Sequence, residues 1–236
     1  MKKIFILFLL TIIGTGTSIE AQNFQPGFNH FSKKKTTYLH MMDGTVQKGN
    51  LKSLDYKKGL IEGIKIRDLE NNKIKIKPEN INFLYIPPSG LAKLGRFMDM
   101  ATDSQQWKNK DLDQNLFKDG YAYFENSDVR VKKKTRNLMM QLVNPDFSDK
   151  IKVYQDPMAG ETMSIGVGPL KAGGIAKSYY VKKANEKVAV RLKKKDYDEE
   201  FAMYFADCPE LIEKYGEKVK WSQFALHVYE YNTLCN

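Results

Sequence analysis

Two kinds of hydrophobic spacing divide the chain: alternation typical of strands over most of its length, and helical spacing near the C-terminal end. Residues 179–205 contain both kinds. Tyr179 and Val181 predict one strand of a hairpin, with residues 184–186 as its loop. In the second strand an apolar row alternates with a basic row: Val188, Val190 and Leu192 against Lys187, Arg191 and Lys193.

Helical spacing begins directly after this hairpin. Asp196 is the expected N-cap, and Glu199, three residues later, completes the pattern of a capping box. One face of the predicted helix carries Tyr197, Phe201, Tyr204 and Phe205. A further helix is expected from Pro209 to Tyr215, with Gly216 as its stop. The last helix carries an apolar stripe of Trp221, Phe224, Val228 and Tyr231.

Five short strands are predicted earlier in the chain, over residues 38–42, 45–54, 60–67, 74–77 and 81–86. Asp43-Gly44 and Asn71-Asn72 are expected turns between them. Short strands at this spacing favour a small curled antiparallel sheet or barrel over residues 36–88, which Pro87 and Pro88 end.

A helical linker is predicted over residues 89–120. It contains a helix with Leu91, Leu94, Met98 and Ala101 on one face, followed by a polar connection anchored by Trp107 and Phe117. Residues 121–236 form the second part, with strands over 121–124, 129–131, 138–143, 151–154 and 162–167, and with a turn at residues 126–128. The predicted class is α+β, mainly antiparallel; whether the two β parts form one sheet stays open.

The N-terminus has the three-part order of a secretory signal peptide. Lys2 and Lys3 precede an apolar run over residues 4–13, and small polar residues lead to Ala21. The run is too short to span a bilayer, so we expect cleavage near Ala21 and a flexible arm over residues 22–35. No later stretch is apolar enough for a transmembrane segment, which predicts a soluble protein of the periplasm or the extracellular space.

Charge and cysteine content narrow the chemistry. The 38 basic and 28 acidic residues give a net charge of +10, which favours anionic partners. Cys208 and Cys235 are the two cysteines. In an exported protein such a pair favours a disulfide, and two unpaired thiols are the alternative. There is no C-x-x-C and no zinc-ligand spacing, so we predict no metal and no cofactor.

Three patterns have both a catalytic and a structural interpretation. Glycines at residues 166–174 resemble a phosphate-binding loop, but a strand follows them rather than a helix, which favours a hairpin loop. The histidines are far apart and no G-x-S-x-G is present, which argues against a nucleophile triad. Acids at residues 196–200 are typical of the first turn of a helix, and Asp156 and Glu161 are expected loop residues.

The basic rows are the clearest functional signal. Each lies opposite the apolar row of its own strand: Lys73, Lys75 and Lys77; Arg130, Lys132 and Lys134; Lys187, Arg191 and Lys193. If two such strands are neighbours, they form one basic face suited to an anionic glycan or to lipopolysaccharide phosphate. The alternative is a solvated face that keeps sheet edges unpaired. The export signal and the absence of a base-reading motif disfavour nucleic acid.

Several segments resemble a known group of proteins. Ala21-Gln22, Asp43-Gly44-Thr45, the SYYVKK segment at residues 178–183 and DCPEL at residues 207–211 are similar to uncharacterised exported proteins of Bacteroidetes-type bacteria. The resemblance implies an envelope or secreted location, and it brings no activity and no catalytic residues.

These observations lead to a functional hypothesis and two alternatives. The leading hypothesis is an exported non-enzymatic protein that binds an anionic envelope component or an envelope protein. One alternative is an envelope-acting hydrolase, which requires polar groups converging in a deep pocket. The other is a structural subunit whose partner covers a sheet edge.

Overall fold

The computed structural model describes residues 24–27, 30–57, 59–90, 112–160 and 175–235. Several predictions lie outside the described residues: the signal peptide at residues 1–21, the helix that follows Pro88 together with Trp107, the strand at residues 162–167, the glycine-rich loop, and Glu161.

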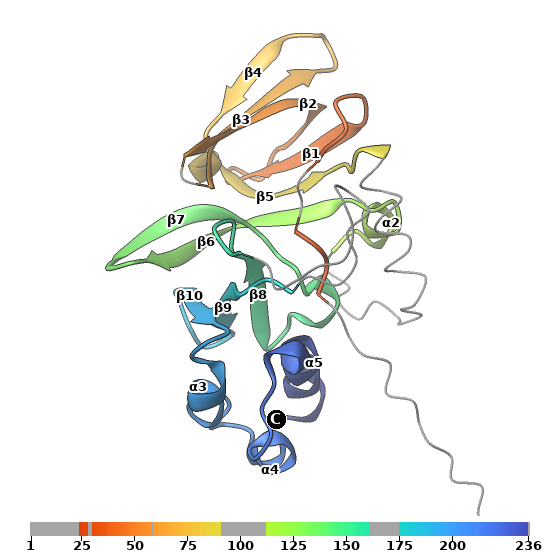
Figure 1. The fold of residues 1–236 in the computed structure, drawn as a ribbon. Coiled ribbons are helices and arrows are strands. Elements are labelled where there is room, and N and C mark those ends of the chain that lie inside the picture. The colour runs from red at the N-terminus through yellow and green to blue at the C-terminus, as the bar shows by residue number, and fades with distance from the viewer. Residues whose placement is uncertain (1–23, 28–29, 58, 91–111, 161–174, 236) are drawn as a thin grey trace, which may run out of the picture.

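Seven strands form one antiparallel sheet in the order β4-β3-β2-β1-β5-β6-β7 (Figure 1). Their bounds are β1 (Thr36–Met41), β2 (Val46–Lys57), β3 (Leu60–Asp68), β4 (Lys73–Ile76), β5 (Ile81–Ile86), β6 (Ala122–Val131) and β7 (Lys134–Gln141). The sheet curls until β7 approaches β3, and its inner face encloses a core that includes Leu39, Ile64 and Leu84. The predicted α+β class is confirmed, with antiparallel sheet as its main component.

Local turn chemistry sets the register of the first hairpin. Gly44 has φ +83°, a conformation that costs little for a residue without Cβ. The Asp43 carboxylate accepts a hydrogen bond from the Thr45 amide at 2.9 Å. Leu39 then pairs with Gln47 and is fully buried. The predicted Asp-Gly turn is therefore confirmed, and so is the apolar row that depends on its register.

Strand β6 answers the question that the sequence left open. Its first half pairs with β5, Leu84 opposite Phe124, so β6 and β7 continue the sheet that begins with β1. The turn predicted at residues 126–128 is wrong, because β6 runs through them. Asn126 donates its side-chain amide to the carbonyls of Pro78 and Ile81, at 3.0 and 3.2 Å. Asn126 is thus tolerated inside this strand because its side-chain nitrogen has two carbonyl partners.

The second sheet has three strands in the order β10-β9-β8, and helices cover the face that points away from the first sheet (Figure 1). Its strands are β8 (Ile151–Gln155), β9 (Ser178–Lys183) and β10 (Val190–Lys193). The helices are α2 (Gln114–Lys118), which precedes β6, then α3 (Tyr197–Tyr204), α4 (Pro209–Tyr215) and α5 (Phe224–Leu234), with short 3-10 turns η1 (Pro78–Asn80), η2 (Pro145–Phe147) and η4 (Trp221–Gln223). The predicted stripes on α3 and α5 are confirmed as core.

The predicted apolar row of β10 is only partly correct. Leu192 is buried at 3%, but Val190 is 48% exposed. Ala189, on the opposite face, is fully buried instead. The reason is an isolated parallel bridge between Ala189 and Val129, which draws this residue against β6.

The capping box predicted for α3 does not form. The helix begins after Asp196 as expected, but the Asp196 side chain makes no capping hydrogen bond. Its carboxylate lies 3.1 Å from Lys195 and 3.8 Å from Lys193. Two neighbouring cations therefore replace the backbone amides as partners of this acid.

The predicted flexible arm docks at its described residues. Phe24 packs against Phe147, Tyr179 and Phe224. The Gln25 amide donates to the Val143 carbonyl at 2.7 Å. An aromatic anchor and a backbone hydrogen bond thus hold the start of the described chain against the core between the second sheet and the C-terminal helices.

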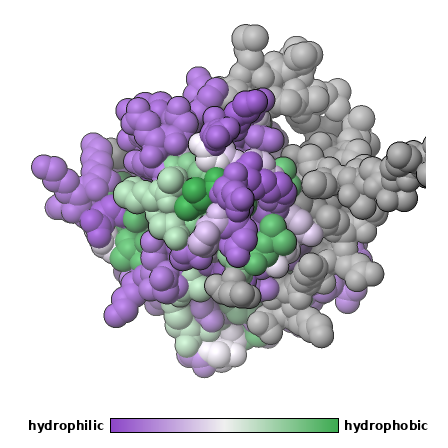
Figure 2. Space-filling view, turned by 90° about the horizontal axis from the view of Figure 1, so that it is seen from below, coloured by the Kyte–Doolittle hydropathy of each residue, from purple (hydrophilic) through white to green (hydrophobic). Residues whose placement is uncertain are grey.

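The C-terminal helices present a mixed surface. Figure 2, which views the molecule from their side, shows an apolar area surrounded by hydrophilic residues. Met203 of α3 and Leu234 of α5 are exposed large apolar side chains on these helices. Within the described ranges, no helix is long and apolar enough to cross a membrane.

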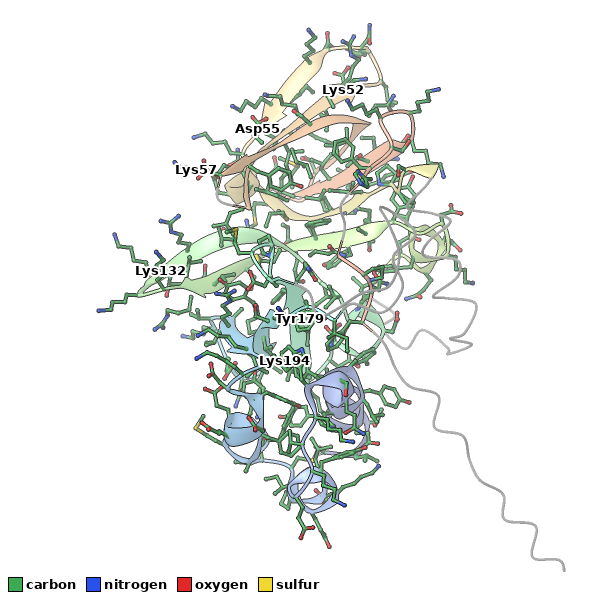
Figure 3. The ribbon with its side chains drawn as sticks, in the orientation of Figure 1. Lys52, Asp55, Lys57, Lys132, Tyr179 and Lys194 are labelled. Atoms are coloured by element: carbon green, nitrogen blue, oxygen red, sulfur yellow. A yellow bond between two sulfur atoms is a disulfide. The ribbon has the colours of Figure 1, made fainter. Side chains whose placement is uncertain are left out.

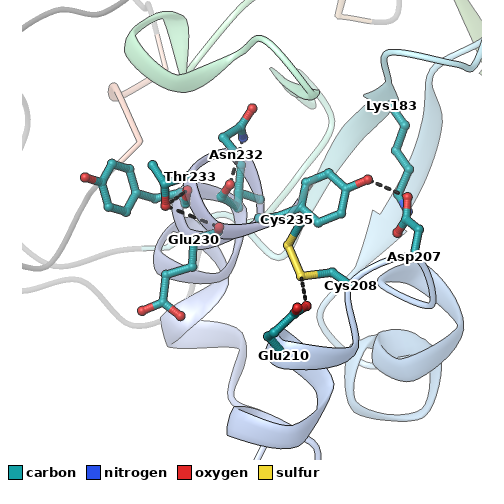
Figure 4. The surroundings of a disulfide bond; sticks show 11 residues. Lys183, Asp207, Cys208, Glu210, Glu230, Asn232, Thr233 and Cys235 are labelled. Atoms are coloured by element: carbon teal, nitrogen blue, oxygen red, sulfur yellow. Dashed lines mark hydrogen bonds and ion pairs between the residues drawn. A yellow bond between two sulfur atoms is a disulfide. The ribbon is translucent and has the colours of Figure 1, made fainter.

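A disulfide joins Cys208, which precedes α4, to Cys235, which follows α5 (Figure 4). The two Cα atoms are 5.3 Å apart and both residues are buried. Beside it, Asp207 accepts from Tyr231 at 2.6 Å and from Lys183 at 2.8 Å. The predicted disulfide is confirmed, and it closes a loop that contains α4, η4 and α5.

Replacing both cysteines by alanine should lower the free energy of unfolding by about 3 kcal/mol, because the 27-residue separation restricts the unfolded chain. Urea unfolding of the oxidised protein and of the double variant measures the difference. Reduced wild-type protein should unfold close to the variant. Equal midpoints for all three samples would show that the bond does not constrain the unfolded state.

His227 is a buried histidine in the helical core. Its Nδ1 lies 2.7 Å from the Tyr197 hydroxyl, and its ring contacts those of Phe201 and Tyr215. Burial, reinforced by the charge of Lys214, lowers the pKa of His227 from 6.5 to about 4. The folded protein therefore keeps this ring neutral over a pH range in which the unfolded chain protonates it.

A depressed histidine pKa makes folding less favourable in acid, because only the unfolded state binds the proton between pH 6.5 and about 4. As the pH is lowered from 6.5 to about 4, the free energy of unfolding should therefore fall. His227 should contribute on the order of 3 kcal/mol to this fall. His227→Gln retains a hydrogen-bonding group for Tyr197 and should flatten the profile. Parallel pH profiles for both proteins would contradict the assignment.

Candidate anion-binding site

A cationic cavity lies where the second sheet meets the C-terminal helices. Its volume is about 590 Å³. Five cations line it, from the residue before β9, from β10 and from the turn that enters α3: Lys177, Arg191, Lys193, Lys194 and Lys195. Figure 3 labels Lys194 at this junction. Arg191 and Lys193 belong to the basic row predicted from the sequence.

A buried carboxylate holds the arginine of the cavity. The Arg191 Nε lies 2.6 Å from Asp156 Oδ2, and Asp156 is 1% exposed. Ser178 donates its hydroxyl to the same carboxylate at 2.7 Å and accepts from Arg191 Nη2 at 3.1 Å. These contacts use part of the guanidinium and fix its plane, so its remaining N–H groups are oriented before any ligand arrives.

The lysines of the cavity differ in how far they are neutralised. Lys193 and Lys195 share Asp196, at 3.8 and 3.1 Å. Among the described residues, Lys177 and Lys194 have no acid within ion-pair distance, and both are exposed. Among the described residues, Asp198 is the one carboxylate that lines the cavity. The described lining therefore keeps an excess of positive charge after its internal pairs are formed.

An apolar wall completes the cavity. Val219, Trp221 and Tyr197 also line it. Trp221 donates its indole N–H to the Ala176 carbonyl at 2.8 Å, which fixes the ring. Burial raises the pKa of Tyr197, so its hydroxyl stays neutral beside His227. Tyr197 and Trp221 are 1% and 7% exposed, so they offer a ligand little surface, and the exposed cations make the cavity suited to an anionic group such as that of a charged sugar.

The other predicted basic residues are not all brought to this place. Lys73, Lys75 and Lys77 lie on or beside β4, an edge strand of the seven-stranded sheet. Lys75 lies 3.5 Å from Asp55, and Lys77 lies 3.7 Å from Glu79. This group is thus a partly neutralised, solvated edge, as the alternative interpretation of the sequence described.

The remaining predicted residues lie next to β10. Lys187 precedes this strand, while Arg130 and Lys132 belong to the end of the β6–β7 hairpin. The Arg130 amide donates to the Ala189 carbonyl at 2.8 Å. The structure therefore makes neighbours of two of the three predicted basic groups and separates the third.

A second polar cluster joins the two sheets. Glu125 of β6 accepts from Lys152 of β8 at 2.8 Å and from the Tyr154 hydroxyl. Lys182 of β9 donates to the Ser127 hydroxyl at 3.1 Å, and burial lowers the pKa of Lys182. A cavity of about 410 Å³ reaches Glu125 and Lys152. Ser127 is buried, and the Glu125 carboxylate is occupied by its partners, so the cluster acts as a polar joint between sheets.

Sequence patterns missed part of the cationic cavity. Lys194 and Lys195 continue the run that begins at Lys193, which was a visible signal. Lys177 is 14 residues from Arg191 in sequence and gave none. Asp156 was expected in a loop; its carboxylate is instead buried under Arg191, and no local pattern predicts that contact.

Comparisons with known proteins add no identity. No protein family, no curated protein and no solved structure matches this chain. Within the described ranges, no three His, Cys, Asp or Glu side chains are grouped as a metal site would need. The function of this chain is therefore inferred from the residues of the site.

Asp156→Asn should lower the free energy of unfolding by about 3 kcal/mol, because it leaves Arg191 without its buried ionic partner while the side-chain size is kept. Urea unfolding measures the loss. Asp196→Asn is the matched control, since it also removes an acid beside the cavity. Its lysine partners are exposed, and the expected loss is below about 1 kcal/mol. Equal losses for the two variants would refute the role given to Asp156.

Proposed function

We propose that this protein is an exported, non-enzymatic binding protein whose cationic cavity takes the anionic group of an envelope component. The location is inferred from the charged, apolar and small residues that precede Gln22. The ligand class is inferred from the cavity. The observation that carries the proposal is the convergence of five cations, one of them oriented by a buried carboxylate, on a single cavity.

The distribution of charge supports binding over simple solvation. Solubilising lysines work wherever they face water, and they need neither a concave arrangement nor a buried acid beneath them. Here Arg191 is held by Asp156 at 2.6 Å, and Trp221 is held by Ala176 at 2.8 Å. Because these side chains are already ordered, the protein loses less side-chain entropy when a ligand binds. An anionic sugar of a glycan or of lipopolysaccharide matches the positive charge of the cavity.

Trp221 provides a direct test because it lines the cavity and the chain has two tryptophans. In a Trp107→Phe background, the fluorescence of Trp221 should change saturably on titration with galacturonate trisaccharide or with isolated lipopolysaccharide. Affinity should fall as salt rises, because exposed charge pairs are screened. Neutral maltotriose is the control ligand and should leave the fluorescence unchanged.

Lys177→Glu with Lys194→Glu should weaken binding of both anionic ligands at least tenfold, since each reversal replaces attraction by repulsion. Lys73→Glu with Lys118→Glu makes the same change in net charge on exposed lysines far from the cavity, and it should change affinity less than twofold. Equal weakening by the two pairs would mean that only net charge matters and would defeat the cavity proposal.

A further inference from the structure

The end of the β6–β7 hairpin concentrates positive charge. β6 and β7 remain paired down to Val131 and Lys134, and a two-residue turn connects them. Five of the seven residues from Arg130 to Arg136 are cations: Arg130, Lys132, Lys133, Lys134 and Arg136. All five are exposed, and Figure 3 shows Lys132 at the outer end of a hairpin that projects from the body of the protein. These five residues are called the basic hairpin below.

The cations of the basic hairpin have no acidic partners. In the described part of the chain, none of the five takes part in an ion pair or in a side-chain hydrogen bond. The nearest acid along β6, Asp128, accepts from Asn137 at 3.0 Å. On the opposite side of the sheet, Lys65 and Lys75 share Asp55. Unpaired like charges on neighbouring residues repel one another, so the basic hairpin opposes its own stability.

The turn residues of the basic hairpin also oppose local preference. Lys132 has φ +56°, in the left-handed region that disfavours residues with a Cβ. Two-residue hairpin turns favour Asn and Gly at such positions. Elsewhere this chain uses Gly44, Gly59 and Asn71 where φ is positive. Lys132 thus combines an unfavourable conformation with uncompensated charge, a combination that marks functional rather than structural selection.

The basic hairpin lies beside the strand that leads into the cationic cavity. The Ala189 amide donates to the Asp128 carbonyl, and the Arg130 amide donates to the Ala189 carbonyl, both at 2.8 Å. From this parallel bridge, β10 continues to Arg191 and Lys193, which line the cavity. Neighbouring strands lie about 5 Å apart. A ligand longer than the cavity can therefore touch both basic groups.

The chemistry of the basic hairpin selects among anionic partners. The other two residues between Arg130 and Arg136 are Val131, which is half-buried, and Thr135. It offers no aromatic ring for stacking a nucleic-acid base and no large apolar side chain for insertion into a membrane. It offers a row of ammonium and guanidinium groups that can bind the repeated negative charges of a ligand. We propose that the basic hairpin and the cationic cavity together bind an anionic polysaccharide, with one charged sugar in the cavity and further carboxylate, sulfate or phosphate groups along the hairpin.

This proposal rests on the function proposed for the cavity and makes a separate demand, which is dependence on chain length. Polygalacturonate should bind more tightly than galacturonate trisaccharide at equal sugar concentration, because it engages both sites. The test variant is Lys132→Gly with Lys133→Asn, which places glycine at the turn position with positive φ and should fold at least as stably as the wild type. It should weaken polygalacturonate binding about tenfold and flatten its salt dependence, while trisaccharide affinity stays within twofold. Lys73→Gln with Lys118→Gln is the charge-matched control and should have no effect on either ligand.

The outcomes separate the two proposals. Unchanged polygalacturonate affinity in the turn variant would overturn the role of the basic hairpin, while loss of trisaccharide binding in the cavity variant would still support the cavity. Polygalacturonate binding that depends on the hairpin but not on Lys177 and Lys194, with no trisaccharide binding, would reject the cavity and keep a surface site for polyanions. Tighter hairpin-dependent binding to duplex DNA or to vesicles containing anionic lipid would overturn the assignment to a polysaccharide. Dextran sulfate in place of polygalacturonate tests whether sulfate substitutes for carboxylate.

Discussion

Two backbone hydrogen bonds between Ala189 and β6 set the relation between the two sheets. The pairing of β5 with β6 ends at Glu125, so the following residues of β6 have one edge without a strand partner. Backbone groups in such a position need another partner if they are to be buried. Ala189 supplies it, with an acceptor for Arg130 and a donor for Asp128. The start of β10 is thereby fixed, and with it the strand that carries Arg191 and Lys193 into the cavity.

The polar joint beside this contact explains why reactive residue types gather between the sheets. Glu125, Lys152 and Tyr154 bond to one another, and Lys182 bonds to Ser127. A buried charge is tolerated when its partners are close and its hydrogen bonds are complete. Both conditions hold for Glu125, which meets Lys152 through both carboxylate oxygens. The buried Asp156 is likewise paired with Arg191. In that pair, however, Arg191 lines a cavity, so the pair can contribute to a binding site, whereas the Glu125 cluster only connects the two sheets.

Sequence patterns predicted those features that neighbouring residues determine. The strands, the turn at Gly44, the helix that begins after Asp196 and the stripe on α5 all follow from spacing, and the two cysteines lie close enough to bridge. Features that depend on distant partners were missed. From the sequence alone, Asn126 is typical of a turn. Only the fold shows that its side chain donates to the carbonyls of Pro78 and Ile81. The alternation predicted that Val190 is buried, but the bridge between Ala189 and β6 leaves Val190 exposed. For the site, Arg191 and Lys193 were visible as a basic row, whereas Lys177 and Asp156 joined them only through the fold.

The fate of each predicted basic group shows how a charged surface becomes a candidate site. At the edge formed by β4, Lys75 pairs with Asp55 and Lys77 pairs with Glu79, so much of the charge of this group is neutralised locally. In the cavity, Asp156 and Asp196 neutralise some cations and orient them, while Lys177 and Lys194 keep their charge. At the basic hairpin, no acid in the described ranges pairs with any of the five cations. Every unpaired charge raises the energy of the folded state and attracts counter-ions. Unpaired charge increases from the β4 group through the cavity to the basic hairpin, so an external anion gains most by binding at the basic hairpin.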